Sequence, residues 1–155
     1  MVAGIEIQVE APDSRDARWC LNAYFTEIAA RFEGGFDAAA DNTARDEDMT
    51  PPAGYFFVAR LDGRPVGCGA LKLYEGRVGD VKRMWTAPSA RGMGVASAVL
   101  DAIEAKAAGV GIGTLRLETN KVLLEAQAMY RRRGYREVEA FNDLPYAHFW
   151  FAKQL

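Results

Sequence analysis

The chain has 155 residues, half of them apolar and 26% charged, an ordinary balance for one globular domain. The formal net charge of −2 excludes the general basic character of a nucleic-acid binder, and no apolar run approaches the roughly 20 residues of a membrane span. The chain opens without a basic segment followed by an apolar stretch, so we expect one cytoplasmic domain over 1–155 with neither nucleic acid nor membrane as partner.

The first elements predicted along the chain are a strand and a helix. Residues 5–10 alternate apolar and polar side chains, as a half-buried strand does. Asp13 is a candidate N-cap, and apolar residues from Leu21 to Phe32 then recur at helical spacing up to Gly34–Gly35. Cys20 lies in this helix pattern and Cys68 in a later strand pattern, so we expect two free buried thiols rather than a disulfide.

Three antiparallel strands are predicted next, after a stretch rich in Gly, Asp, Ala and Pro over 34–54. Asp62–Gly63 is a favoured two-residue hairpin turn, and it would join strands at 55–61 and 64–74. Glycines at 67 and 69 inside the second of these strands are typical of a bulge. A third strand follows over 77–86.

The rest of the chain alternates helices and strands. A helix that opens near Arg91–Gly92 and ends at Gly109 separates the strand at 77–86 from one at 114–118, so these two strands should be parallel. A further helix and two short strands are expected over 121–133, 135–139 and 147–153. The pattern predicts an α+β fold with a mixed, mostly antiparallel sheet and one βαβ crossover.

The segment 81–100 has the properties of a phosphate-binding site. The first turn of a helix leaves about four backbone N–H groups without internal partners, and these point outward at the positive end of the helix dipole. The small residues around Gly92 and Gly94 would let an anion approach this backbone. A nucleotide-triphosphate loop is absent, and GMGVAS at 92–97 fails the last position of a dinucleotide fingerprint. The alternative is that both glycines only permit tight packing of strand on helix.

Two motifs in this region resemble those of the GNAT N-acetyltransferase superfamily. Arg91-x-x-Gly94-x-Ala96 is similar to the acetyl-CoA signature of that family, and AQAMYRRRGY at 126–135 is similar to its second signature. The likeness covers about residues 55–155, whereas the N-terminal third fits by layout only. The resemblance implies a GNAT-like sheet with helices on both faces and an acyltransferase that uses acetyl-CoA as co-substrate.

The resemblance also implies which residues hold this co-substrate. Strands equivalent to 80–86 and 114–118 splay apart in the family, and the pantetheine arm inserts between them. The Met84 N–H is the candidate to polarise the thioester carbonyl, and Tyr130 would donate a proton to the departing thiolate. Leu123 stands where the family often has Asn, so Asn120 is the nearby candidate to hold the arm. Backbone groups of the following residues would contact the cofactor: Met84, Trp85, Thr86, Arg91, Gly92, Met93, Gly94, Val95 and Ala96.

The general base is left open between two carboxylates and water. An alkylamine is mostly protonated at neutral pH, so its proton must be removed before the amine attacks. Asp80 stands where some family members carry a basic glutamate, and Glu118 at the end of the neighbouring strand competes with it. Either carboxylate could instead form a salt bridge with Lys82 or Arg83. Tyr130 itself could be a core tyrosine, and we expect no metal site.

The acceptor is also left open at the level of sequence. The acidic residues Asp37, Asp41, Asp46, Glu47 and Asp48 would favour a cationic amine. The aromatic residues Tyr24, Phe25, Phe32, Phe36 and Tyr55 would instead favour an aromatic amine. The leading hypothesis is acetylation of a primary amine of a small molecule by direct attack. The alternatives are a protein lysine or N-terminal acetyltransferase and a non-catalytic acyl-CoA sensor, and a homodimer is not excluded.

Overall fold

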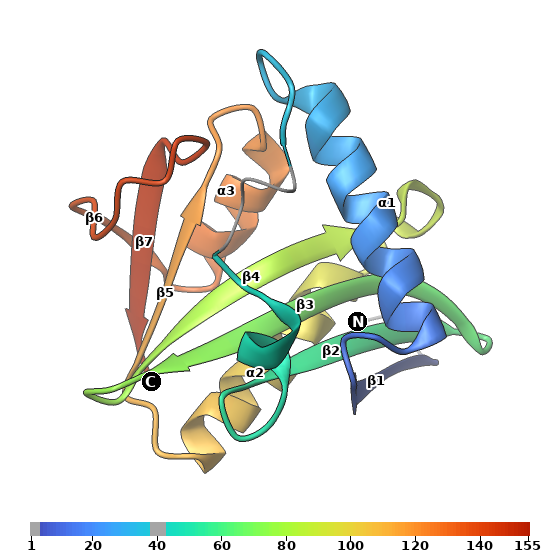
Figure 1. Ribbon diagram of the computed structural model, residues 1–155, viewed down its shortest axis with the longest axis horizontal. Helices are drawn as coiled ribbons and strands as arrows, with labels where there is room; N and C mark the ends of the chain where they lie inside the picture. The colour runs from blue at the N-terminus through green and yellow to red at the C-terminus, as the bar shows by residue number, and fades with distance from the viewer. Residues whose placement is uncertain (1–3, 38–42) are drawn as a thin grey trace.

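The strands of the described residues pair into one seven-stranded sheet in the order β1-β2-β3-β4-β5-β7-β6 (Figure 1). The computed structural model describes residues 4–37 and 43–155. The strands are β1 Ile5–Glu10, β2 Gly54–Leu61, β3 Arg64–Tyr74, β4 Val78–Thr86, β5 Thr114–Thr119, β6 Arg136–Val138 and β7 Phe149–Gln154. The α-helices are α1 Arg15–Arg31, α2 Val95–Gly109 and α3 Leu124–Arg132, and short 3-10 turns lie at Asp46–Met49 and Pro88–Ala90.

The predicted antiparallel strands and the single crossover are confirmed. β1 to β4 pair with one another as antiparallel neighbours, whereas β4 and β5 are parallel and α2 connects them. At the hairpin between β2 and β3, Asp62 has φ 50 and Gly63 has φ 76. Two positive φ angles match the right-handed twist of the flanking strands, which explains why this dipeptide is favoured there.

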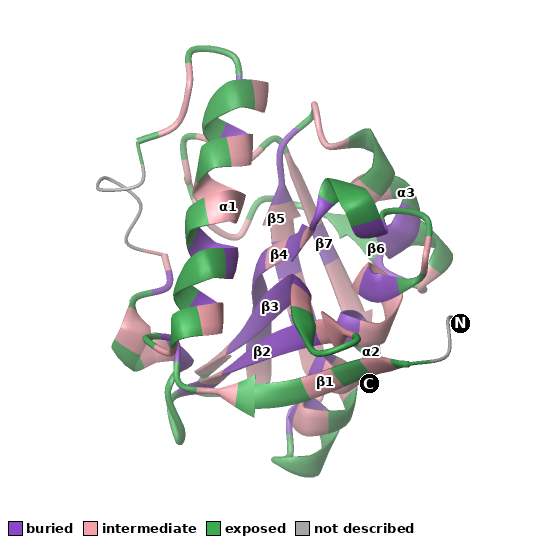
Figure 2. Cartoon of the chain, turned by 90° about the vertical axis from the view of Figure 1, so that its right-hand side faces the viewer, coloured by how far each residue is buried: buried purple, intermediate pink, exposed green. Residues whose placement is uncertain are grey.

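Helices cover both faces of the sheet. Figure 2 shows α1 on one side and α2 and α3 on the other, with the buried residues of α1 turned toward the strands. The face of α2 that packs on β3 is apolar and includes Val99, Leu100 and Ile103, each 0% exposed. Cys20 and Cys68 are both buried and free, as expected. Within the described part of the chain, no helix has the length and apolarity required to cross a bilayer.

Several element boundaries differ from those predicted. Ser14, not Asp13, caps α1, because its side chain accepts a hydrogen bond from the Ala17 amide at 3.1 Å. The second helix begins at Val95 rather than near Arg91–Gly92, because Gly92 (φ 78) and Gly94 (φ 85) adopt conformations that an α-helix excludes. The last helix starts at Leu124, β6 is one residue shorter at each end than predicted, and β7 begins two residues later and ends one residue later.

The sheet opens between β4 and β5. Their parallel pairing is limited to residues 78–80 of β4 against 114–116 of β5. Beyond Asp80 the two strands diverge, and Figure 1 shows the wedge that widens toward α1 and α3. The second half of β4 therefore pairs with β3 on one side and with no strand of the described chain on the other.

Candidate active site

A bulge in β4 shapes the wall of the wedge. Between Cys68 and Ala70 the register with β3 shifts, so that Arg83 and Met84 together face Gly69. Arg83 has φ 58, which is uncommon for a non-glycine residue and re-aims the residues on either side. The predicted bulge is thus confirmed at Gly69. As a result, four consecutive residues of β4, 81–84, line the same cavity.

One cavity lies over the start of α2. It measures about 510 Å³ and extends from the second half of β4, across the turn at 91–94, to α3. Within the described chain, no protein group accepts a hydrogen bond from the backbone amides of Val95, Ala96 and Ser97. A Cβ at Gly92 would meet nothing within 4 Å, so close packing does not explain that glycine. Its positive φ does, because it turns the chain so that three amides face the cavity.

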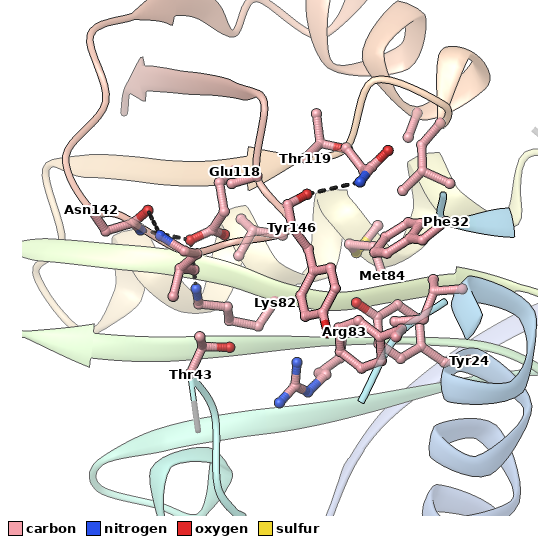
Figure 3. A pocket seen from close by; sticks show the side chains of 18 of the residues that line it. Tyr24, Phe32, Thr43, Lys82, Arg83, Met84, Glu118, Thr119, Asn142 and Tyr146 are labelled. Carbon is pink, nitrogen blue, oxygen red and sulfur yellow. Dashed lines mark hydrogen bonds and ion pairs between the residues drawn. The ribbon is translucent and has the colours of Figure 1, made fainter. Parts of the chain in front are cut away.

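A second cavity of about 510 Å³ adjoins the first through a shared wall. It is enclosed by α1, β4, β5 and the segment before β7, and Figure 3 shows part of its lining. The shared wall contains Tyr24, Ile28, Met84, Leu123, Ala126 and Tyr130. A ligand reaching along the first cavity would therefore meet a ligand of the second beside Met84 and Tyr130.

Tyr130 lies at this junction with its phenol protonated. Its side chain is 5% exposed, and burial raises the pKa of the phenol well above its usual value. The nearby Tyr24 and the charge of Glu118 raise this pKa further. Within the described chain, the hydroxyl has no hydrogen-bond partner, so it can donate to a bound group.

The two candidate bases occupy different surroundings. The Asp80 carboxylate is 2% exposed, accepts a hydrogen bond from Arg116 Nε at 2.9 Å and lines neither cavity. Burial raises the pKa of Asp80 even though Arg116 opposes the shift. Glu118 instead lines the second cavity, where its Oε1 accepts from Lys82 Nζ at 2.8 Å and Asn142 Nδ2 at 2.9 Å (Figure 3). Its Oε2 has no partner among the described residues.

The comparisons with known proteins agree with this arrangement. The family model of the acetyltransferase (GNAT) family matches residues 21–135. The IAA acetyltransferase of Azospirillum brasilense is 36% identical over 114 residues, which is 72% of this chain and 74% of that protein. This chain belongs to the GNAT acetyltransferase family.

Solved structures show the same fold. A proposed acyl-CoA N-acyltransferase from Klebsiella pneumoniae superposes with a TM-score of 0.80 and 28% identity over 97% of both chains. A GNAT acetyltransferase from Elizabethkingia anophelis with acetyl-CoA bound superposes with a TM-score of 0.69 over 99% of both chains, at 12% identity. At that identity the second likeness concerns the fold alone.

The first GNAT signature forms the turn and helix start described above. Arg91 donates from its guanidinium to the Thr86 carbonyl at 3.1 Å and pairs with Glu27 of α1. Of the residues predicted to contact the cofactor, all but Met93 and Asn120 line the first cavity. Asn120 lines the second cavity instead, where its side chain donates to the Tyr146 carbonyl and accepts from the Val122 amide. The side-chain amide of Asn120 thus connects the segment after β5 with the segment before β7.

The described acidic residues expected to attract a cationic amine do not lie at the second cavity. Asp46 pairs with Arg18, and Asp48 accepts from the Arg45 amide at 2.9 Å. None of Asp37, Asp46, Glu47 and Asp48 lines either cavity, and Asp41 lies outside the described residues. Of the aromatic residues considered, Phe25 and Tyr55 also line neither cavity, and Lys106 of α2 lies over the Tyr55 ring at 5.0 Å.

Several lining residues escaped the sequence reasoning. Lys72, Asn142 and Tyr146 line the second cavity, and Arg31 lines the first. Asn142 and Tyr146 lie in an aperiodic segment that gives no pattern to interpret. β3 offered one usable signal, because Lys72 directly follows six buried residues, 66–71, and is itself partly buried. Within the described residues, no group of three or more His, Cys, Asp or Glu is placed to hold a metal ion.

Proposed function

We propose that this GNAT protein moves an acetyl group from acetyl-CoA to the primary amine of a small molecule by direct attack. The observation that carries the proposal is that the two cavities share a wall, which contains Met84 and Tyr130. One cavity offers unpaired amides of the kind that bind a diphosphate, and the other offers a carboxylate beside an enclosed space. Acetyl-CoA supplies an acyl group already activated as a thioester.

The cofactor cavity fits a diphosphate attached to an extended arm. The amides of Val95, Ala96 and Ser97 point at the anion, and the dipole of the 15-residue helix adds to the attraction. Arg132 lines the same cavity and adds positive charge. The open side of β4 along Met84–Thr86 would pair with the amides of the arm, since buried strand groups require partners.

The residues at the junction would act on the two reacting groups. The Met84 N–H would donate to the carbonyl oxygen as negative charge develops there. The Tyr130 hydroxyl would donate a proton to the departing sulfur, and its raised pKa keeps that proton available. Glu118 Oε2 would accept the proton of the amine, directly or through one water. Asp80 is less well placed for this role, because Arg116 engages it outside the cavity.

Two hydrogen bonds beside the acceptor cavity support a small molecule over a protein. The loop before β7 is tied to the end of β5, since the Asn120 side chain donates to the Tyr146 carbonyl at 2.9 Å. The Tyr146 hydroxyl in turn accepts from the Asp37 amide at 3.1 Å, at the far side of the cavity. A protein substrate would require this bridge between two segments to open.

Cofactor binding is tested by a pair of variants at Ala96, which lines the cofactor cavity in the first turn of α2. Ala96→Glu places negative charge where it favours the helix dipole yet repels a phosphate. Ala96→Gln adds the same bulk without the charge. Calorimetric titration with acetyl-CoA should give tight binding for the wild type, weaker binding for Ala96→Gln and the weakest for Ala96→Glu. Equal affinity for both variants would contradict the placement of the phosphates.

Activity is tested by thiol release from acetyl-CoA in the presence of a panel of primary amines, peptides included. Turnover with small amines and not with peptides is expected. Turnover with peptides alone would favour a protein acetyltransferase. Tight binding of acetyl-CoA with no turnover on any amine would overturn the enzymatic proposal in favour of an acyl-CoA sensor.

A further inference from the structure

We propose that Asn142 and Trp150 position the Glu118 carboxylate for the removal of the amine proton. The inference rests on the proposed function, because it takes Glu118 as the group that accepts this proton. It is carried by a chain of hydrogen bonds that runs from the Trp150 indole through the Asn142 amide to one oxygen of Glu118.

The sheet brings Glu118 and Trp150 to the same face. The two residues are directly opposed in the antiparallel pair of β5 and β7, and opposed residues project to one side of a sheet. Asn142 lies in the segment between β6 and β7. Its neighbour Phe141 packs on Arg116, two residues before Glu118 on β5, with Arg116 Cζ 4.2 Å from the ring centroid. The segment is thus anchored beside Glu118 at a second point.

The partners of the Asn142 side chain decide which of its atoms faces Glu118. Trp150 Nε1 lies 2.9 Å from one end of the side-chain amide, and an indole N–H is a donor only, so this end is the oxygen. The Leu144 amide donates to the same oxygen at 3.5 Å. The other end is therefore the nitrogen, Nδ2, which donates to Glu118 Oε1 at 2.9 Å (Figure 3). A reversed amide would set two oxygens against each other.

Two donors from different elements hold a single oxygen of Glu118. Lys82 Nζ reaches Oε1 from β4 at 2.8 Å, and Asn142 Nδ2 reaches it from the segment before β7. The terminal torsion of a glutamate is broad when nothing restrains it. A lysine on its flexible stem restrains this torsion little, whereas an amide fixed at both ends sets its angle. Oε2, which has no partner among the described residues, is thereby held in one direction for the amine.

The neighbouring charges are arranged in two separate pairs. The charges of Lys82, Arg116 and Glu118 all act on Asp80, and that of Glu118 also acts on Tyr130. Arg116 bonds to Asp80 at 2.9 Å and Lys82 to Glu118 at 2.8 Å, so each carboxylate has its own cation. During the reaction an N–H bond of the bound ammonium breaks. Its proton passes to Glu118 Oε2, and the electron pair stays on the nitrogen for the attack.

Kinetics of single variants test the positioning, with the most rapidly acetylated amine of the panel as acceptor. Asn142→Ala should lower kcat/KM at pH 7 by about 10-fold, because a misplaced catalytic group loses rate. Trp150→Phe keeps a ring but removes the N–H, and we expect a smaller loss. Both losses should shrink toward about pH 10, where the amine loses its proton unaided. The Kd of acetyl-CoA should stay unchanged, because neither residue lines the first cavity.

A double variant separates positioning from a structural role. In the Glu118→Gln background, Asn142→Ala should cause no further loss, because Asn142 acts through Glu118. Losses that multiply in the double variant, or an unchanged kcat/KM in Asn142→Ala, would overturn the inference and leave the enzymatic proposal intact. The matched controls are Asn22→Ala and Trp19→Phe on α1, which should leave kcat/KM unchanged, since both residues lie outside the lining of either cavity.

A spectroscopic measurement requires no turnover. In protein labelled with nitrogen-15 at asparagine, the side-chain amide signal of Asn142 is identified by its loss in Asn142→Ala. This signal should move in Glu118→Gln and in Trp150→Phe but not in Trp19→Phe. That result would support the positioning of Glu118 even if no amine turned over and the enzymatic proposal failed. A signal unchanged by both substitutions would overturn the inference, whatever the activity.

Discussion

At the scale of single residues, Tyr130 combines a hydroxyl that stays protonated with a position fixed by burial. Burial raises the pKa of its phenol, so the hydroxyl stays protonated throughout the range in which the enzyme would be assayed. The second GNAT signature indicated the residue from sequence. Its protonation state could not be inferred there, because burial is a property of the packed structure.

Tyr130→Phe removes the proton donor and little else. We expect kcat to fall by roughly 100-fold, with the affinity for acetyl-CoA nearly unchanged. Because the raised pKa lies above the assay range, the ratio of wild-type to variant kcat should stay constant between about pH 7 and pH 10. A ratio that falls steadily over this range would mean that Tyr130 titrates, and an unchanged kcat would exclude proton donation.

Glu118→Gln tests the removal of the amine proton. At pH 7 we expect kcat/KM to fall by roughly 100-fold, because most of the alkylamine is then protonated. The loss should shrink toward about pH 10, where the amine loses its proton in solution without help. Asp80→Asn is the comparison variant, since Asp80 lines neither cavity, and its kcat/KM should change little. The opposite ranking of the two variants would assign the base to Asp80.

At the scale of elements, the bulge in β4 and helix α2 depend on each other. A Cβ on Gly69 would lie 2.6 Å from Met84 Sδ and 2.7 Å from Val99 Cγ1, contacts that no folded protein accommodates without movement. Gly69 therefore lets α2 pack directly on the sheet beside the residue predicted to polarise the thioester. The same contact links the stability of the core to the shape of the site.

Gly69→Ala should consequently destabilise the protein by about 1–3 kcal/mol, as overpacking of a core does. Its control is Gly109→Ala at the end of α2, where an added Cβ meets nothing within 4 Å and a helix gains about 0.5–1 kcal/mol from the substitution. Chemical denaturation of both variants measures the difference. A Gly69→Ala variant as stable as the wild type would show that α2 can shift without cost.

The elements also show what a sequence can predict. The types of the strands and helices are predictable because the spacing of apolar side chains is a local property of the sequence. Apolar and polar residues alternate at 5–10, which forms a strand, and apolar residues recur at helical spacing after Ser14, where the helix forms. The start of α2 was misplaced, because a run of small residues does not disclose that Gly92 and Gly94 take positive φ. The lining of the second cavity by four consecutive residues of β4 depends on the bulge at Arg83, and Tyr146 reaches this cavity from an aperiodic loop. Such features follow from tertiary packing and were inaccessible beforehand.

At the scale of the whole molecule, the sheet consists of two parts that are joined by a short stretch of strand pairing. β1–β4 and β5–β7–β6 share only the pairs at 78–80 and 114–116. Side chains span the rest of the opening, as when Arg31 of α1 reaches Glu125 of α3 at 2.5 Å and the Val122 carbonyl at 3.0 Å. A ligand that enters the wedge would contact both parts at once.

Acetyl-CoA should therefore stabilise the entire chain. At about 100 times its Kd we expect the unfolding midpoint to rise by roughly 5–10 °C, from mass action alone. Hydrogen exchange should slow in the open half of β4 and in β5 together. The Ala96→Glu variant should lose both effects under the same conditions. Protection confined to one side of the wedge would show that the ligand does not bridge it.

The wall shared by the two cavities has a pharmacological consequence. Because Met84 and Tyr130 border both spaces, a ligand in one cavity and a ligand in the other would both contact these two residues. A bisubstrate conjugate, with coenzyme A tethered to an acceptor mimic through a short linker, would occupy both compartments as one molecule. Tethering makes the second association intramolecular, so its affinity should exceed that of either half by roughly 10²–10⁴-fold.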